Sequence, residues 1–177
     1  MKDLILLGST GSIGNAVLNV VKKNNSNFKI KLLTTNKNIK KIYQQAVYFN
    51  VKKVVILDYQ NYEKFSHLFR KKKIKVYSKI DEALKTFTKR VYFTISGISG
   101  IEGLEPTLKT IKYTENLGIA NKESIICGWD LIKSKAKKYN TKVIPIDSEH
   151  FSILKLLETH KLKDINKIYL TASGGPF

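Results

Sequence analysis

The N-terminal segment constrains the fold most, because an apolar strand, a glycine-rich turn and an amphipathic helix follow one another there. The run Leu4-Ile5-Leu6-Leu7 is continuous rather than alternating, which is typical of a central parallel strand covered on both faces. Glycine recurs at every third position from Gly8 to Gly14, and apolar residues recur at helical spacing from Ala16 to Val21. A second apolar run at residues 30–33 completes a strand–helix–strand unit, whose crossover is expected to be right-handed.

The same alternation continues along the chain. Further strands are predicted at residues 54–57, 74–77, 91–95, 116–120 and 143–146, and helices at 39–49, 62–72, 80–87, in the stretch opened by Glu105-Pro106, and at 123–138. Strands that alternate with helices at this rhythm predict an α/β fold with a doubly wound, mostly parallel, Rossmann-like sheet and helices on both faces.

The pattern changes after Ile146. A helix is predicted at residues 150–157, an irregular stretch at 162–165 and a short strand at 168–170, before the final Gly174-Gly175-Pro176-Phe177. We therefore expect a Rossmann-like domain over residues 1–146 and the beginning of a second α/β domain over residues 147–177. This second domain is expected to be truncated, so that the chain is the front part of a longer protein.

Composition limits the compartment and the partners. The 177 residues are 42% hydrophobic, but no apolar run has the length of a membrane helix, and the N-terminus has no signal-peptide pattern. The single cysteine, Cys127, allows no disulfide framework and fits a reducing compartment. We expect a soluble, cytoplasmic protein without a membrane partner.

The net charge of +18 comes almost entirely from lysine, since only Arg70 and Arg90 are arginines. Sites that recognise nucleic-acid sequence tend to use arginine in one patch, whereas these lysines are spread over nearly every polar stretch. We therefore expect no specific nucleic-acid partner, and a modest, salt-dependent attraction for anionic ligands. A basic nucleotide- or nucleic-acid-binding module without chemistry is the alternative.

The turn Gly8-x-x-Gly11-x-x-Gly14 lies between a predicted strand and a predicted helix, which is the context of a dinucleotide fingerprint. Glycine lets backbone N–H groups approach a pyrophosphate closely, and a helix N-terminus favours its negative charge. The spacing differs from the commoner G-x-G-x-x-G, and a plain tight turn is the alternative. We interpret the segment as a nucleotide-binding turn.

The end of the second predicted strand indicates which nucleotide is bound. It leads into Thr34-Thr35-Asn36-Lys37-Asn38. An NAD enzyme places an acidic residue here for the ribose hydroxyls, whereas hydroxyls, amides and Lys37 favour NADPH with its additional phosphate. A solvated loop lysine is the alternative.

Two polar segments, Asn121-Lys122-Glu123 and Asp147-Ser148-Glu149, follow the last predicted strands. Because ligands bind at the carboxyl ends of parallel strands, both segments are expected to share a crevice with the glycine turn. If the second segment stays extended, its two carboxylates point the same way, as ligands for a hard divalent cation, and Ser148 points across. The alternatives are a solvated helix start at Asp147 and a simple helix cap at Asn121.

Four stretches together resemble the 1-deoxy-D-xylulose 5-phosphate reductoisomerase family. They are Leu7-Gly-Ser-Thr-Gly-Ser-Ile-Gly14, Ala120-Asn-Lys-Glu-Ser124, Pro145-Ile-Asp-Ser-Glu-His150 and Leu170-Thr-Ala-Ser-Gly-Gly-Pro-Phe177. The resemblance spans the whole chain and implies an NADPH- and divalent-metal-dependent isomerisation and reduction. The substrate would be 1-deoxy-D-xylulose 5-phosphate and the product 2-C-methyl-D-erythritol 4-phosphate, in the non-mevalonate route to isoprenoid precursors. The resemblance also implies a homodimer at full length. Another NAD(P)-dependent dehydrogenase, of semialdehyde or homoserine type, is the enzyme alternative.

The resemblance implies a role for each matching residue. The NADPH phosphates would be held by Thr10, Gly11, Ser12 and Ile13, the adenosine end by Asn36, Lys37 and Asn38, and the nicotinamide end by Asn121 and Glu123. Asp147 and Glu149 would ligate Mg²⁺ or Mn²⁺. The sugar-phosphate substrate would contact Lys122, Ser148, Glu149 and Ser173, with Lys122 and Glu149 as the catalytic residues.

The chain also departs from the family pattern. After His150, the run Phe151-Ser-Ile-Leu154 replaces the run that is usual in the family. In the family, the third metal carboxylate, the lid over the active site and most phosphate-binding residues lie beyond the position of Phe177. The resemblance therefore implies that this chain binds NADPH weakly and does not turn over.

Overall fold

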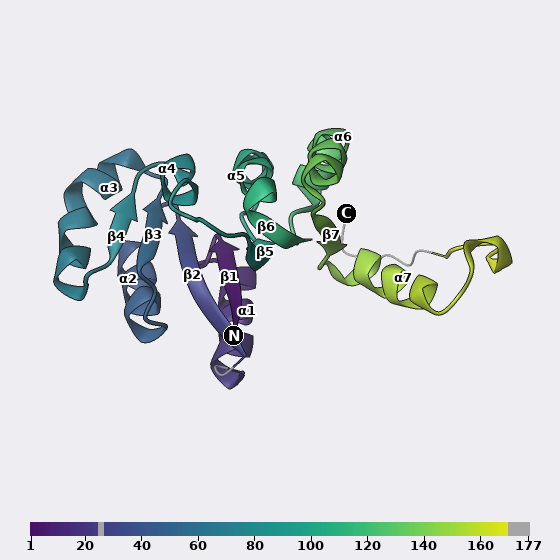
Figure 1. The fold of residues 1–177 in the computed structure, drawn as a ribbon, viewed down its shortest axis with the longest axis horizontal. Coiled ribbons are helices and arrows are strands. Elements are labelled where there is room, and N and C mark those ends of the chain that lie inside the picture. Colours follow the sequence, from purple (N-terminus) through teal and green to yellow (C-terminus); the bar gives the residue numbers. More distant parts are fainter. Residues whose placement is uncertain (25–26, 170–177) are drawn as a thin grey trace, which may run out of the picture.

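The structure is a computed structural model that describes residues 1–24 and 27–169. Its centre is a seven-stranded sheet with the strand order β4-β3-β2-β1-β5-β6-β7 (Figure 1). The strands are β1 (Lys2–Leu7), β2 (Phe28–Thr35), β3 (Lys53–Ile56), β4 (Lys75–Tyr77), β5 (Val91–Ser96), β6 (Thr114–Ile119) and β7 (Lys142–Pro145). Every pairing is parallel, so the predicted α/β fold with a doubly wound parallel sheet is confirmed.

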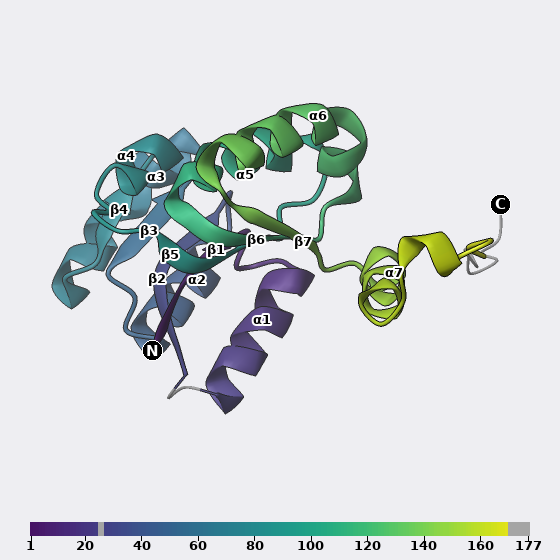
Figure 2. The same ribbon diagram turned by 45° about the vertical axis from the view of Figure 1, so that its right-hand side comes forward.

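Helices cover both faces of the sheet. They are α1 (Ser12–Lys23), α2 (Ile39–Tyr48), α3 (Tyr59–Phe65), α4 (Ile80–Leu84), α5 (Leu104–Thr110), α6 (Lys122–Tyr139) and α7 (Ser148–Glu158). Side chains of β1 alternate between two cores: Leu4 and Leu6 pack with residues of α1 and α2, while Ile5 and Leu7 pack with residues of α4. Figure 2 shows the resulting layers, with α1 on one side of the sheet and α5 and α6 on the other.

The strand order reverses beside β1. Strands β1 to β4 extend in one direction, and β5 then lies on the other side of β1. The loops that follow β1 and β5 touch, because a Cβ on Gly8 (φ +76°) would lie 2.8 Å from the carbonyl oxygen of Gly97. This is the topological switch point, outside whose strand ends open α/β sheets bind their ligands.

The C-terminal part of the described chain leaves the sheet. Helix α7 begins beyond β7, has no buried residue and extends away from the sheet edge (Figure 1). A 3-10 helix at Leu162–Asp164 follows it. Among the residues that the structure describes, none of the helices has the length and hydropathy of a membrane span.

Some elements differ from their predictions. The helix predicted at residues 80–87 ends at Leu84 as α4, and the stretch predicted to be irregular at 162–165 contains the 3-10 helix. The helix predicted at residues 62–72 is α3 followed by a 3-10 helix, Ser66–Lys72, which ends at Lys73 in the left-handed conformation. The strand predicted at residues 168–170 is wrong for Ile168 and Tyr169, which are in no strand. Apolar β-formers make a strand only where a neighbouring strand is available, and the chain has already left the sheet through α7. Leu170 and the predicted substrate contact Ser173 lie outside the described residues.

Candidate cofactor and metal site

The glycine turn is packed tightly except at one position. A Cβ on Gly14 would lie 2.4 Å from the carbonyl oxygens of Gly8 and Ser9, so α1 can start this close to β1 only with glycine there. Gly11 is different, because its φ is −77° and a Cβ on it would meet no atom closer than 3.6 Å. The packing of the chain therefore does not require glycine at position 11, whereas a ligand that approaches the backbone closely would.

The first turn of α1 offers hydrogen-bond donors to such a ligand. Its cap residue, Gly11, has no side chain to accept from the helix, and the first turn contains no acidic residue. Backbone N–H groups at a helix start have no intrahelical acceptor, and no described residue outside the helix accepts from Ser12, Ile13 or Gly14. These donors and the positive end of the helix dipole suit a phosphate. The turn therefore fits the pyrophosphate of a dinucleotide.

Buried polar groups of β2 and α2 hold the turn in place. The N–H groups of Gly8 and Ser9 donate to Thr34, to its Oγ1 at 2.8 Å and its carbonyl oxygen at 2.9 Å. Gln45 donates from Nε2 to the carbonyl oxygen of Ser9 at 3.0 Å and accepts from Ser9 Oγ at 2.8 Å. Ser9 and Thr34 are fully buried, so the start of the turn is anchored in the core, while Gly11, Ser12 and Ile13 remain exposed.

Sequence reasoning missed Gln45. The signal was present, since Gln45 is an amide among the inward-facing residues of a helix whose other buried positions are Ile42 and Ala46. A polar side chain at a core position needs a buried partner. Here that partner is the glycine turn.

The predicted adenosine-binding residues lie in the exposed loop between β2 and α2. Asn38 caps α2 by accepting from the backbone N–H of Lys41 at 3.2 Å. Asn36 and Lys37 are exposed. Thr10, on the glycine turn, lies against this end of β2, with its Oγ1 2.9 Å from Thr35 Oγ1. The structure therefore places the loop beside the turn, as one nucleotide site requires.

Asn121 is buried at the corner between β6 and α6. Its Oδ1 accepts from the N–H of Ser124 at 2.8 Å, and its Nδ2 donates to the carbonyl oxygens of Gly100, at 2.5 Å, and Ile98. The helix-cap alternative is thus observed for this residue. Both of its N–H groups are engaged, so only its oxygen has capacity for a further bond, and its role toward a nicotinamide stays a prediction.

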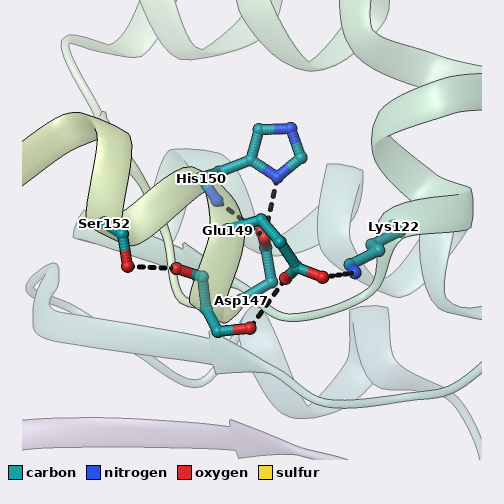
Figure 3. Close-up of polar contacts among 6 residues, drawn as sticks. Lys122, Asp147, Glu149, His150 and Ser152 are labelled. Carbon is teal, nitrogen blue, oxygen red and sulfur yellow. Dashed lines mark hydrogen bonds and ion pairs between the residues drawn. The ribbon is translucent and has the colours of Figure 1, made fainter. Parts of the chain in front are cut away.

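Asp147 and Glu149 lie at the start of a helix rather than in an extended segment (Figure 3). Asp147 caps α7: its Oδ1 accepts from the N–H of His150 at 3.0 Å and lies 2.7 Å from His150 Nδ1. Ser148 Oγ donates to Glu149 Oε2 at 2.7 Å. The predicted geometry, with Ser148 pointing across from the carboxylates, is therefore wrong, because the cap turns the chain into a helix directly after Asp147.

Lys122, at the start of α6, reaches the acidic segment from a different strand end. Its Nζ lies 3.0 Å from Glu149 Oε1 (Figure 3). This hydrogen bond raises the pKa of Lys122, with help from the charges of Glu149, Asp147 and Glu123. The hydrogen bonds from Ser148 and Lys122 lower the pKa of Glu149 to about 2. At neutral pH the lysine is therefore protonated and the glutamate ionised.

The pKa of Asp147 is lowered for a different reason. Burial opposes its charge, but the hydrogen bonds from the backbone and ring of His150 outweigh burial and lower its pKa. Carboxylate oxygens are the ligands that Mg²⁺ and Mn²⁺ prefer, so the donor type at positions 147 and 149 fits such an ion. In the described part of the chain no cluster of three or more His, Cys, Asp or Glu side chains could hold a metal, so these two residues would supply part of a ligand set.

The fold and the glycine turn at its switch point define a dinucleotide-binding α/β domain. Within that class, the chain belongs to the 1-deoxy-D-xylulose 5-phosphate reductoisomerase family. The family model matches residues 4–128, and the model of the family's C-terminal domain matches residues 143–177. The predicted family, one of NADPH-dependent oxidoreductases, is therefore confirmed over the alternative of a semialdehyde or homoserine dehydrogenase.

Curated relatives carry the same description along the whole chain. The 1-deoxy-D-xylulose 5-phosphate reductoisomerase of Pelagibacter ubique is 49% identical over all of this chain and 46% of its own length. That of Clostridium acetobutylicum is 38% identical over all of this chain and 47% of its own length. The chain thus spans about half the length of the curated relatives it matches.

Solved structures of the same family share the fold. The Zymomonas mobilis reductoisomerase in complex with NADPH is 28% identical, with a TM-score of 0.76 over 84% of this chain and 39% of its own. A reductoisomerase in complex with NADPH, fosmidomycin and magnesium is also 28% identical, with a TM-score of 0.77 over 85% of this chain and 37% of its own.

Proposed function

We propose that this chain forms the cofactor-binding part and the first metal ligands of a 1-deoxy-D-xylulose 5-phosphate reductoisomerase. The reaction is the NADPH-dependent isomerisation and reduction of that substrate to 2-C-methyl-D-erythritol 4-phosphate, with Mg²⁺ or Mn²⁺. Residues 1–146 form the NADPH domain, and residues 147–177 begin the metal-binding catalytic domain. The observation that carries the proposal is the contact between Lys122 and Glu149, at the strand-end edge of the sheet from which the glycine turn also projects.

NADPH lies across the switch point in this proposal. Thr10, Gly11, Ser12 and Ile13 bind its pyrophosphate, and the exposed loop of Asn36, Lys37 and Asn38 binds the adenosine end with its 2′-phosphate. Asn121 and Glu123 face the nicotinamide end. The open space at Gly11 and the donors of α1 support this placement. When bound, the cofactor supplies the hydride for the reduction.

Lys122 stabilises negative charge that develops on a substrate oxygen. Lysine is protonated at neutral pH, and the raised pKa of Lys122 extends this to more alkaline pH. A fixed cation near a developing oxyanion lowers the barrier. The side chains of Lys122 and Glu149 are 50% and 38% exposed, and exposed ion pairs open at little cost. Both groups can therefore separate and engage the substrate, together with Ser148 and Ser173.

Asp147 and Glu149 hold the divalent ion. Both carboxylates are ionised at neutral pH, and their lowered pKa values extend ionisation to more acidic pH, so no proton has to leave before they ligate. When bound, the ion would polarise the substrate's carbonyl group. His150 keeps Asp147 in place through two contacts to the same oxygen, which leaves the other carboxylate oxygen for a ligand.

The remaining parts of the proposal concern assembly and location. We propose a homodimer at full length and a cytoplasmic location. The charge of +18 is almost all lysine, which supports a general attraction for anionic ligands rather than a specific nucleic-acid partner.

The cofactor assignment is tested with Lys37→Ala. Wild-type chain is expected to bind NADPH more tightly than NADH by nicotinamide fluorescence, and the variant is expected to lose about tenfold in NADPH affinity, the effect of one charge-assisted hydrogen bond. The affinity for NADH stays unchanged, because NADH lacks the 2′-phosphate. Lys40→Ala, next to the loop and exposed, is the matched control. Equal preference for the two cofactors in the wild-type chain would contradict the assignment.

The metal assignment is tested with Asp147→Asn. Asparagine caps helices as well as aspartate, so α7 is retained while the negative charge is lost. We expect Mn²⁺ affinity, measured by electron paramagnetic resonance, to fall at least tenfold. Asp164→Asn, in the exposed 3-10 helix beyond α7, is the control. Unaltered Mn²⁺ binding in Asp147→Asn would remove Asp147 from the ligand set.

A further inference from the structure

We propose that Lys41 is a positioning residue for the phosphate-binding turn, an inference that rests on the proposed NADPH function. From the first turn of α2, Lys41 donates from Nζ to the carbonyl oxygen of Thr10 at 3.0 Å. The contact joins residues 31 positions apart in the sequence. Lys41 is half-buried, whereas the neighbouring Lys40 is exposed. One lysine of the pair is therefore built into the site and the other is not.

The contact sets the orientation of the Thr10–Gly11 peptide, which lies in the middle of the turn and directly before α1. The carbonyl of Thr10 and the N–H of Gly11 belong to one planar trans peptide and point in opposite directions. Lys41 holds the carbonyl toward α2, and the N–H of Gly11 donates to the carbonyl oxygen of Gly8 at 3.2 Å. With this peptide held at both ends, the N–H groups of Ser12 and Ile13 stay directed to the ligand side of the turn.

Lys41 is also the cationic member of the group that holds Thr10. The other side-chain partners of Thr10 are neutral: Asn15 Nδ2 donates to its carbonyl oxygen at 3.3 Å, and its hydroxyl contacts Thr35. The ammonium group of Lys41, beside the carbonyl oxygen of Thr10, adds its positive charge to the field of the α1 N-terminus. Both favour an anion. Lys41 therefore acts on the phosphates through the turn, both by orientation and by charge.

The position of the contact predicts which cofactors are affected. Lys41 Nζ is bonded to the turn that faces the pyrophosphate, a group that NADPH and NADH share. The 2′-phosphate, which only NADPH carries, is assigned to the loop with Lys37. Loss of Lys41 is therefore expected to lower the affinity for both cofactors equally, whereas loss of Lys37 lowers the affinity for NADPH alone.

The experiment compares Lys41→Met with Lys40→Met and Lys41→Arg in the 177-residue chain. Dissociation constants for NADPH and NADH are measured by nicotinamide fluorescence, and thermal unfolding is measured without cofactor. Lys41→Met is expected to lower the affinity for both cofactors about tenfold, since a charge-assisted hydrogen bond is lost. The ratio of the NADPH and NADH dissociation constants and the unfolding temperature should stay unchanged. Lys41→Arg restores the affinity, and Lys40→Met matches wild type.

Other outcomes overturn the inference in distinguishable ways. Wild-type affinity in Lys41→Met rules out any positioning role. Loss of NADPH affinity alone means that Lys41 contacts the 2′-phosphate, and a lower unfolding temperature together with weaker binding means that its role is structural. If the wild-type chain binds neither cofactor, the proposed function fails and this inference with it.

Discussion

The two halves of the candidate site are built in different ways. The glycine turn is held by buried groups from β2 and α2, with Ser9 and Thr34 fully buried and bonded across 25 or more residues of sequence. In the acidic segment, Asp147 accepts from the backbone N–H of His150, three residues on, and Glu149 forms one exposed ion pair with Lys122. Helix α7, which carries most of it, has no buried residue.

The two halves therefore depend on different properties, the glycine turn on its packed geometry and the acidic segment on its charges. The turn is arranged before any ligand arrives, because buried hydrogen bonds from Ser9 to Thr34 and Gln45 anchor it to the core. The acidic segment depends on local hydrogen bonds and on Lys122, so its arrangement responds to whatever charge enters. We therefore expect substitutions at the turn to change the free energy of unfolding, and substitutions in the acidic segment to change ionisation and binding.

The largest expected effect contrasts two glycines of the same turn. Gly14→Ala places a Cβ 2.4 Å from backbone oxygens that cannot move without shifting β1, so the free energy of unfolding is expected to fall by about 3 kcal/mol or more. Gly11→Ala meets no atom closer than 3.6 Å and is expected to cost under about 1 kcal/mol, while NADPH affinity falls at least tenfold. Denaturant unfolding and cofactor titration measure both. Similar stability losses for the two variants would contradict the packing described for the turn.

A smaller effect is expected from Gln45→Leu. The substitution leaves the carbonyl oxygen of Ser9 without its buried donor, Gln45 Nε2, whereas Ser9 Oγ keeps the carbonyl oxygen of Thr34 as a partner. An unsatisfied buried group costs about 2 kcal/mol. The neighbouring Gln44→Leu, on the exposed side of α2, is the control and should change the unfolding free energy by less than about 0.5 kcal/mol. Equal effects from the two would show that the turn does not depend on α2.

The smallest effect is expected from Lys122→Met. Exposed ion pairs contribute little to stability, so thermal unfolding at neutral pH should match wild type. The pKa of Glu149, about 2 in the folded chain, should rise toward its ordinary value, because one of its two side-chain hydrogen-bond donors is lost. Carboxyl-carbon NMR titration measures this shift. A pKa that stays near 2 would mean that Ser148 and the backbone N–H of Glu149 set it without Lys122.

The sign of the pH dependence follows from the same shift. A carboxyl whose pKa is lowered by folding stabilises the folded state above its ordinary pKa, 4.5 for Glu149, and loses that contribution as the pH falls toward about 2. The pKa of Lys122 is raised by folding, so its contribution to stability is fully present below its ordinary pKa of 10.5 and is lost as the pH rises above that value. The contribution of the Lys122–Glu149 pair to stability is therefore expected to stay constant between these two pH limits. A series of thermal unfolding measurements across pH can check this.

Much of the fold could be predicted from the local pattern of apolar residues. The continuous apolar run of β1 and the helical spacing after Gly14 predicted a central strand and a covering helix, and the alternation that follows predicted the parallel sheet. The strand predicted at Ile168 failed because local β-propensity does not supply a neighbouring strand. Periodicity reports which faces are apolar, and says nothing about whether a partner is within reach.

The sequence predicted the residue types of the candidate site better than it predicted their geometry. The sequence pointed to Lys122 and to the two carboxylates, which the structure brings together with Lys122 in contact with Glu149. It could not decide between an extended segment and a helix cap at Asp147, because both are compatible with an acidic residue after a strand.

By itself, then, the sequence determined the order of the elements, the position of the glycine turn and the acidic and basic residues available at the strand ends, since these depend on chain-local periodicity and residue chemistry. Only the tertiary structure decided that Lys41 and Gln45 face the turn, and that Lys122 meets Glu149. The physical reason is that such contacts depend on the register and packing of elements far apart in the chain, which no local pattern encodes.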